Sequence, residues 1–173
     1  MSVLTANSRR DLEIHRYPAP LYLLVPIAAL VLQALLSRYL ARFPYFDLPL
    51  VITIYFALSR RSPIQGMFLG LSLGIFEDAL THHAIGVNGI AKTVAGYLAA
   101  SVGIRIDVQN MFIRLLLTFS LTLLCNGIYL GIYRGLLGME MDWSWLNTLL
   151  QAVGNSLIAL AVFPLLDRFQ IRD

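Results

Sequence analysis

Residues 74–97 read GIFEDALTHHAIGVNGIAKTVAGY and contain two carboxylates, two histidines and the only lysine of the chain. Strongly apolar sequence lies on both sides of this stretch. Of the 173 residues, 58% are hydrophobic and 13% are charged, and the mean hydropathy is +0.71. Soluble domains contain about 25% charged residues. The composition therefore predicts an all-α polytopic membrane protein with a single domain.

Apolar segments of suitable length recur through the chain. About twenty apolar residues are needed to cross the roughly 30 Å hydrocarbon core. Six candidate transmembrane helices follow, of which the second is the shortest: Leu21–Ser37, Phe46–Ser59, Pro63–Leu80, Gly86–Ile104, Met111–Leu137 and Ser144–Leu166. We predict a cytoplasmic tail over 1–19, a six-helix transmembrane domain over 20–167 and a cytoplasmic tail over 168–173. The first nineteen residues are polar, which argues against a cleaved signal peptide.

The basic residues predict the orientation, because cytoplasmic loops of membrane proteins carry an excess of lysine and arginine. With the N-terminus inside, nine arginines fall on inner segments: Arg9, Arg10, Arg16, Arg60, Arg61, Arg105, Arg114, Arg168 and Arg172. Three fall on outer segments, namely Arg38, Arg42 and Arg134. Both termini are therefore expected in the cytoplasm. This distribution of charge does not indicate nucleic-acid binding.

Small residues recur at every fourth position in three of the predicted helices. Such ridges let helices approach closely within a bilayer. The third helix has Gly66, Gly70 and Gly74; the fourth has Ala91, Ala95, Ala99 and Gly103; the fifth has Gly127, Gly131 and Gly135. The ridge of the third helix is assigned to helix packing. For the fifth helix, packing within the chain and docking of a partner are alternatives, and we select its three glycines as candidates for partner docking.

The charged residues of the opening stretch follow the same spacing. Asp78 lies four residues after Gly74, and Asn88 and Lys92 are four apart on the next helix. Residues four apart share a helix face, and an unpaired charge in the membrane costs roughly 2.5–3.5 kcal/mol. We therefore predict a structural Asp78–Lys92 ion pair with Asn88 beside it, and expect Glu77 at the water interface.

Two polar ridges accompany these charges in the last two helices. They comprise Arg114, Thr118, Thr122 and Asn126 in the fifth helix, and Asn147, Gln151 and Asn155 in the sixth. Polar faces of membrane helices point to the bundle interior or to a wet cavity. Hydrogen bonds between helices and a lined pocket are both compatible with this pattern.

No arrangement of residues typical of catalysis is evident in the sequence. His82 and His83 lie near Asp78, but no HExxH motif or further set of ligands completes a metal site. No serine or cysteine is spaced with a histidine in a manner typical of a membrane protease, and no phosphate-binding Walker loop occurs. We therefore predict a protein that is not an enzyme, has no cofactor and binds no metal. The role of the two histidines is left open.

Residues 47–107 read DLPLVITIYFALSRRSPIQGMFLGLSLGIFEDALTHHAIGVNGIAKTVAGYLAASVGIRID. This run resembles the core of the rod shape-determining protein MreD family. The similar features are the short Asp-Leu-Pro helix, the basic turn, the glycine-ridged helix ending at Asp78–Leu80, the Gly86–Asn88 turn and the helix containing Ala91–Leu98. The length and number of helices also agree. His82 and His83 depart from the small or polar residues expected at that turn.

The resemblance implies a non-enzymatic multi-pass scaffold in the bacterial inner membrane. It would belong to the cell-elongation complex, which makes side-wall peptidoglycan. Such a scaffold binds MreC directly and lies near MreB, RodA and the elongation transpeptidase, as well as membrane lipids. The resemblance also implies a fold similar to the S-components of energy-coupling-factor transporters. A substrate-binding subunit of a vitamin-like transporter is therefore the alternative function. That alternative predicts an outward pocket, whereas a scaffold should have a packed interior and an apolar external groove.

Overall fold

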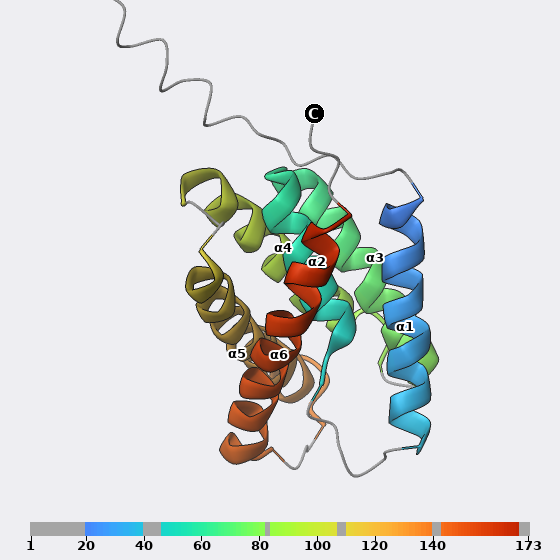
Figure 1. Ribbon diagram of the computed structural model, residues 1–173. Helices are drawn as coiled ribbons and strands as arrows, with labels where there is room; N and C mark the ends of the chain where they lie inside the picture. The colour runs from blue at the N-terminus through green and yellow to red at the C-terminus, as the bar shows by residue number, and fades with distance from the viewer. Residues whose placement is uncertain (1–19, 40–45, 82–83, 107–109, 140–142, 170–173) are drawn as a thin grey trace, which may run out of the picture.

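Six α-helices make up the part of the chain that the computed structural model describes, which is residues 20–39, 46–81, 84–106, 110–139 and 143–169 (Figure 1). These ranges contain no β-strand. The helices are α1 (Leu21–Tyr39), α2 (Leu48–Arg60), α3 (Pro63–Thr81), α4 (Val87–Arg105), α5 (Met111–Gly135) and α6 (Trp145–Asp167). The predicted all-α class is confirmed. The predicted tail over 1–19 and most of 168–173 lie outside the described residues.

Consecutive helices alternate in direction, so the start of α1 and the end of α6 lie at the same end of the bundle, the upper end in Figure 1. We call this the basic end, because it holds Arg60, Arg61, Arg105, Arg114 and Arg168. The other end, where α2, α4 and α6 begin, is called the opposite end. Asp47, Glu77, Asp78 and Lys92 lie toward this opposite end.

The ends of α2 follow from identifiable local signals. Asp47 caps its first turn, with a carboxylate oxygen that accepts a hydrogen bond from the Leu50 amide at 2.8 Å. An N-cap of this kind satisfies an amide that has no partner within the helix. Arg61 adopts a left-handed conformation with φ of 51°, which ends the helix before α3 starts at Pro63. The predicted start at Phe46 was therefore two residues early.

The short helix α2 is the centre of the bundle. It has 13 residues, contacts each of the other helices and is buried from Pro49 to Ser59. Because its sides are covered by protein, α2 does not need the length or the apolar surface of a helix that faces lipid. Tyr55, Phe56 and Phe163 of α6 form the aromatic part of this core, with ring centroids 5.2–5.4 Å apart.

The glycine ridge of α3 packs directly against the backbone of α4. A Cβ atom added at Gly66, Gly70 or Gly74 would lie closer than 3.0 Å to backbone atoms of Gly96, Lys92 or Asn88, respectively. Three successive contacts one helical turn apart hold the two helices together along most of their length. The three glycines that were predicted to serve helix packing lie at this contact between α3 and α4.

The small residues of α4 serve a second interface. Cys125 of α5 contacts the carbonyl oxygen of Ala91 at 3.4 Å, and a Cβ atom at Gly103 would lie 3.0 Å from Leu58 of α2. Ala95 and Ala99 are completely buried between these contacts. One face of α4 therefore receives α3, and the face with Ala91, Ala95 and Ala99 turns toward α2 and α5.

Apolar side chains cover much of the exterior. The helices α5 and α6 are long and apolar enough to cross a membrane, with only 22% and 33% of their most apolar windows buried inside the fold. The core helix of a soluble protein would be mostly buried, so this combination indicates association with a membrane. Large exposed apolar residues also occur on α1 and α3, including Leu23 (68% exposed), Leu24 (63%), Ile64 (68%) and Phe68 (66%).

Candidate functional site

The most strongly charged site in the interior is centred on Lys92 of α4. This lysine is 1% exposed, and its Nζ atom lies 2.9 Å from Asp47 Oδ2 at the start of α2. Lys92 Nζ also forms an ion pair with Glu77 Oε2 of α3. One ammonium group thus links three helices through two carboxylates. Burying such charges is tolerated only where they are paired and hydrogen-bonded.

Asp78 forms a separate cluster beside this ion-paired site. It is completely buried and accepts hydrogen bonds from the Gly86 amide at 2.8 Å, the Asn88 amide at 3.1 Å and Asn88 Nδ2 at 2.7 Å. The carboxylate therefore joins the end of α3 to the first turn of α4, where a helix presents amides without intrahelical partners. The predicted association of Asp78 with Asn88 is present.

The predicted Asp78–Lys92 ion pair is corrected by this geometry. Among the described residues, Lys92 forms its ion pairs with Asp47 and Glu77, while the hydrogen bonds of Asp78 go to Gly86 and Asn88. The physical reason is position. Asp78 lies against the backbone amides at the start of α4, whereas Lys92 lies one turn further along α4, where Glu77 reaches it. Glu77 was expected at the water interface and is instead 8% exposed.

Two ion-pair partners of Lys92, Asp47 and Glu77, were not predicted from the sequence, although signals for both are present in it. Asp47 precedes Leu48–Pro49, a typical helix start, which places it at the same end of the bundle as Lys92. Glu77 follows Gly74 by three residues and Asp78 follows it by four, so both positions share the glycine face. Periodicity alone could not decide which carboxylate meets the lysine.

Hydrogen bonds extend this site across the bundle to α5 and α6. The Asp47 amide donates to Asn155 Oδ1 of α6 at 2.8 Å, and Asn155 Nδ2 donates to Thr122 Oγ1 of α5 at 3.2 Å. Asn155 is completely buried. A second link joins Asn126 Nδ2 to Gln151 Oε1 at 2.9 Å. Of the two alternatives for the polar ridges, these contacts favour hydrogen bonding between helices, although Asn147 is exposed.

A smaller polar site closes the basic end. Arg114 Nη1 lies 2.6 Å from Asp167 Oδ2, and the Tyr55 hydroxyl donates to Asp167 Oδ1 at 2.8 Å. Arg114 also lies over the Phe163 ring, 6.0 Å from its centroid. These contacts connect α2, α5 and α6 and place charge where the bundle meets the exterior.

The glycine ridge of α5 differs from that of α3. A Cβ atom added at Gly127, Gly131 or Gly135 would find nothing within 4 Å, and all three positions are exposed. On the other side of the helix, Tyr129 stacks on Tyr133 at 4.6 Å, and the Tyr133 hydroxyl accepts a hydrogen bond from the Ala84 amide at 3.2 Å. These tyrosines hold α5 against the bundle, while the glycines face outward.

The chemistry of the buried clusters is that of charge pairing and hydrogen bonding. Lys92 and Asp78 are both enclosed and have partners, so neither presents a reactive group to a ligand. Within the described ranges, no group of three or more potential metal-binding side chains occurs. His82 and His83, whose role was left open, lie outside those ranges.

We compared the chain with protein-family models, with curated proteins and with solved structures, and none of the three comparisons gave a match.

Proposed function

We propose that this chain is a non-enzymatic, six-span membrane scaffold of the bacterial cell-elongation complex and that it binds MreC. In this proposal the bundle has an arrangement similar to the S-components of energy-coupling-factor transporters, with the basic end and both termini in the cytoplasm. MreB, RodA and the elongation transpeptidase belong to the same complex. The proposal starts from the resemblance to the MreD family and is supported by the distribution of polar and apolar residues.

Large apolar side chains face outward, and several charged and amide side chains lie inside a largely apolar core. The interior contains buried charged and amide side chains, including Asp78, Lys92 and Asn155, each no more than 1% exposed. The exterior carries exposed leucines, isoleucines and phenylalanines on α1, α3, α5 and α6. The four helices other than α2 and α5 have 19 to 23 residues. With a rise of about 1.5 Å per residue, the length of each is close to the thickness of the hydrocarbon core of a bilayer.

The open glycine ridge of α5 is the observation that supports the binding of MreC. The α3 ridge shows how such glycines are used in this chain, because another helix lies directly on it. Gly127, Gly131 and Gly135 have the same spacing and are uncovered. Small residues in membranes favour close helix association. We assign this face to the single membrane-spanning helix of MreC, the partner implied by the resemblance.

The state of the interior favours a scaffold over the alternative transporter subunit. That alternative requires a ligand pocket open toward the outside, which corresponds to the opposite end of the bundle. There, Lys92 and Asp78 are enclosed, and the surrounding carboxylate, amide and backbone groups bond to one another. The buried polar groups at this end therefore serve the fold itself.

Gly131→Leu tests the assignment of the docking face. The leucine side chain would fill the ridge, while the helix itself would gain up to about 1 kcal/mol of intrinsic propensity. We expect normal membrane insertion and at least about tenfold weaker co-purification with MreC, because close approach of the helices is lost. Cells that depend on this variant should lose their rod shape.

The matched control is Ala79→Leu, which makes a similar change at an exposed position of α3 away from the ridge. It should retain MreC. Full MreC binding by Gly131→Leu would remove the α5 face from the proposal. Saturable binding of a small vitamin-like molecule to the purified protein would favour the transporter-subunit alternative.

A further inference from the structure

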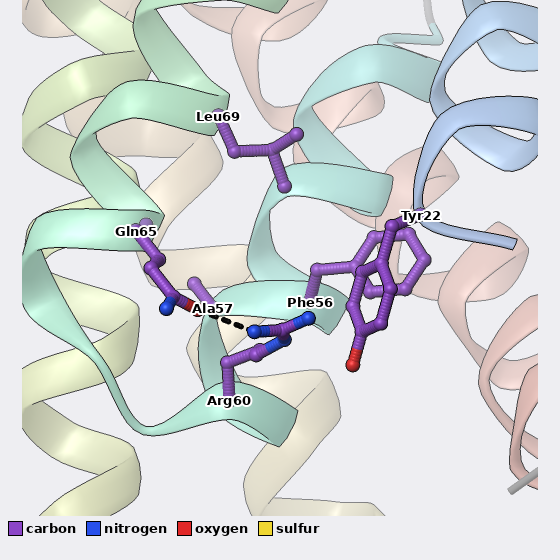
Figure 2. Close-up of a pocket in the computed structure, with 7 residues that line it drawn as sticks. Tyr22, Phe56, Ala57, Arg60, Gln65 and Leu69 are labelled. Atoms are coloured by element: carbon purple, nitrogen blue, oxygen red, sulfur yellow. Dashed lines mark hydrogen bonds between the residues drawn. The ribbon is translucent and has the colours of Figure 1, made fainter. Parts of the chain in front are cut away.

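A pocket of about 250 Å³ lies at the basic end between α1, α2 and α3 (Figure 2). Tyr22 borders it on α1, Phe56, Ala57 and Arg60 on α2, and Gln65, Gly66 and Leu69 on α3. Figure 2 shows Tyr22 and Gln65 on opposite sides, Leu69 at one edge and the Arg60 guanidinium across the other. The pocket shares no lining residue with the Lys92 site or with the glycine ridge of α5.

Arg60 gives the pocket a positive charge held in a defined orientation. Its guanidinium carbon lies 3.9 Å from the centre of the Tyr22 ring, and Nη1 donates to Gln65 Oε1 at 2.9 Å. A guanidinium group has five N–H donors. Within the described ranges, the ion pairs of the chain involve Lys92 and Arg114, and no carboxylate is paired with Arg60. Its charge therefore remains available to an anion.

The remaining lining is apolar, so the pocket suits an amphipathic ligand better than a free anion. Phe56 and Ala57 form the buried floor, and Leu69 forms part of the wall. Pockets for complete small molecules occupy roughly 300–1,000 Å³, which exceeds the volume here. The space suits the polar head of a larger molecule whose apolar remainder lies outside the pocket. The exterior of α1 and α3 is apolar, and Leu24 and Phe68 on it are 63% and 66% exposed.

We infer that this pocket binds the phosphate headgroup of an anionic phospholipid, with the acyl chains against the apolar exterior of α1 and α3. Arginine pairs with phosphate through charge-assisted hydrogen bonds. Basic pockets between helices on the cytoplasmic side of membranes are suited to anionic lipid heads, and the basic end is the end that we place in the cytoplasm. This site is independent of the MreC-docking face.

The test measures lipid retention by the purified full-length protein. Native mass spectrometry after delipidation and titration with phosphatidylglycerol should show one tightly retained lipid. Phosphatidylcholine should bind at least about tenfold more weakly, because its choline cation offsets the phosphate charge that pairs with Arg60. Arg60→Gln should lose this preference. Arg105→Gln, which removes an exposed arginine from the same end without touching the pocket, should keep it.

Three results would overturn the inference: equal retention of phosphatidylglycerol by the Arg60→Gln and Arg105→Gln proteins, equal binding of both lipids by the unmodified protein, or displacement of the lipid by millimolar inorganic phosphate. The last result would assign the site to a soluble phosphate compound. Leu69→Phe provides a second variant, because it reduces the space while leaving Arg60 in place. It should weaken phosphatidylglycerol binding even if Arg60→Gln proves difficult to fold.

Discussion

Lys92 joins three helices through one buried ammonium group. Its ammonium group holds Asp47 and Glu77, and through Asp47 it connects to Asn155 and Thr122. Removing one member of a buried ion pair leaves the other charge without compensation, which is costlier than removing both. Lys92 therefore stabilises the association of α2, α3 and α4 with the last two helices.

Lys92→Met should destabilise the folded protein by about 3–5 kcal/mol, because two buried carboxylates would face each other without their cation. The Lys92→Met/Glu77→Gln double variant should recover part of this loss. The measurement is the denaturant-induced unfolding of each purified variant in detergent, analysed as a double-mutant cycle. A Lys92→Met protein as stable as the unmodified one would contradict this role.

Asp78→Ala supplies the control for that cycle. Its contacts are with Gly86 and Asn88, so its loss should destabilise the turn between α3 and α4 by a route separate from Lys92. The coupling of Asp78→Ala with Lys92→Met should be smaller than the coupling of Glu77→Gln with Lys92→Met. The opposite order of these coupling energies would support the Asp78–Lys92 ion pair that was predicted from the sequence.

At the scale of helices, the two glycine ridges have opposite surroundings and so predict opposite responses to the same substitution. Gly70→Ala would force a methyl group against the Lys92 carbonyl, a backbone atom that cannot move aside. Gly127→Ala would place the methyl group in open space. Alanine is favoured over glycine in a helix by about 1 kcal/mol, so Gly127→Ala should be neutral or stabilising in the purified protein.

Thermal unfolding of the two variants in the same detergent tests this contrast. Gly70→Ala should lower the midpoint or the yield of folded protein, because α3 and α4 would have to separate. Gly127→Ala serves as its matched control. Equal destabilisation by both would show that the α5 ridge is covered in the purified protein.

The helices and the α3 ridge were predictable because both depend on short-range patterns. Apolar runs, Pro63 and the i+4 spacing of Gly66, Gly70 and Gly74 are visible in the sequence. The partners of Lys92 were not predictable, because they depend on how α3 is rotated against α4 and on Asp47, the N-cap of α2. A choice between Glu77 and Asp78, which are adjacent, requires three-dimensional packing. The central place of α2 likewise depends on contacts with all the other helices.

The molecule as a whole has an apolar core with buried charged and amide clusters, an apolar exterior and unequal ends. Arg60, Arg61, Arg105 and Arg168 lie at one end, and the buried carboxylates lie toward the other. Both proposals depend on the same claim, that this bundle crosses the membrane with its basic end in the cytoplasm. The lipid site would then face the leaflet with anionic surface potential, and the α5 ridge would reach the outer side.

Cysteine accessibility in intact bacteria tests that claim most directly. Single cysteines replace Ser62, Ile85 or Leu136 in a Cys125→Ser background, since Cys125 is the only native thiol. Ile85 and Leu136 are 73% and 79% exposed near the opposite end, and Ser62 lies in the turn between α2 and α3 at the basic end. A membrane-impermeant maleimide should label positions 85 and 136 in intact cells, and position 62 only after the membrane is opened. Labelling of position 62 in intact cells, with positions 85 and 136 protected, would contradict the account.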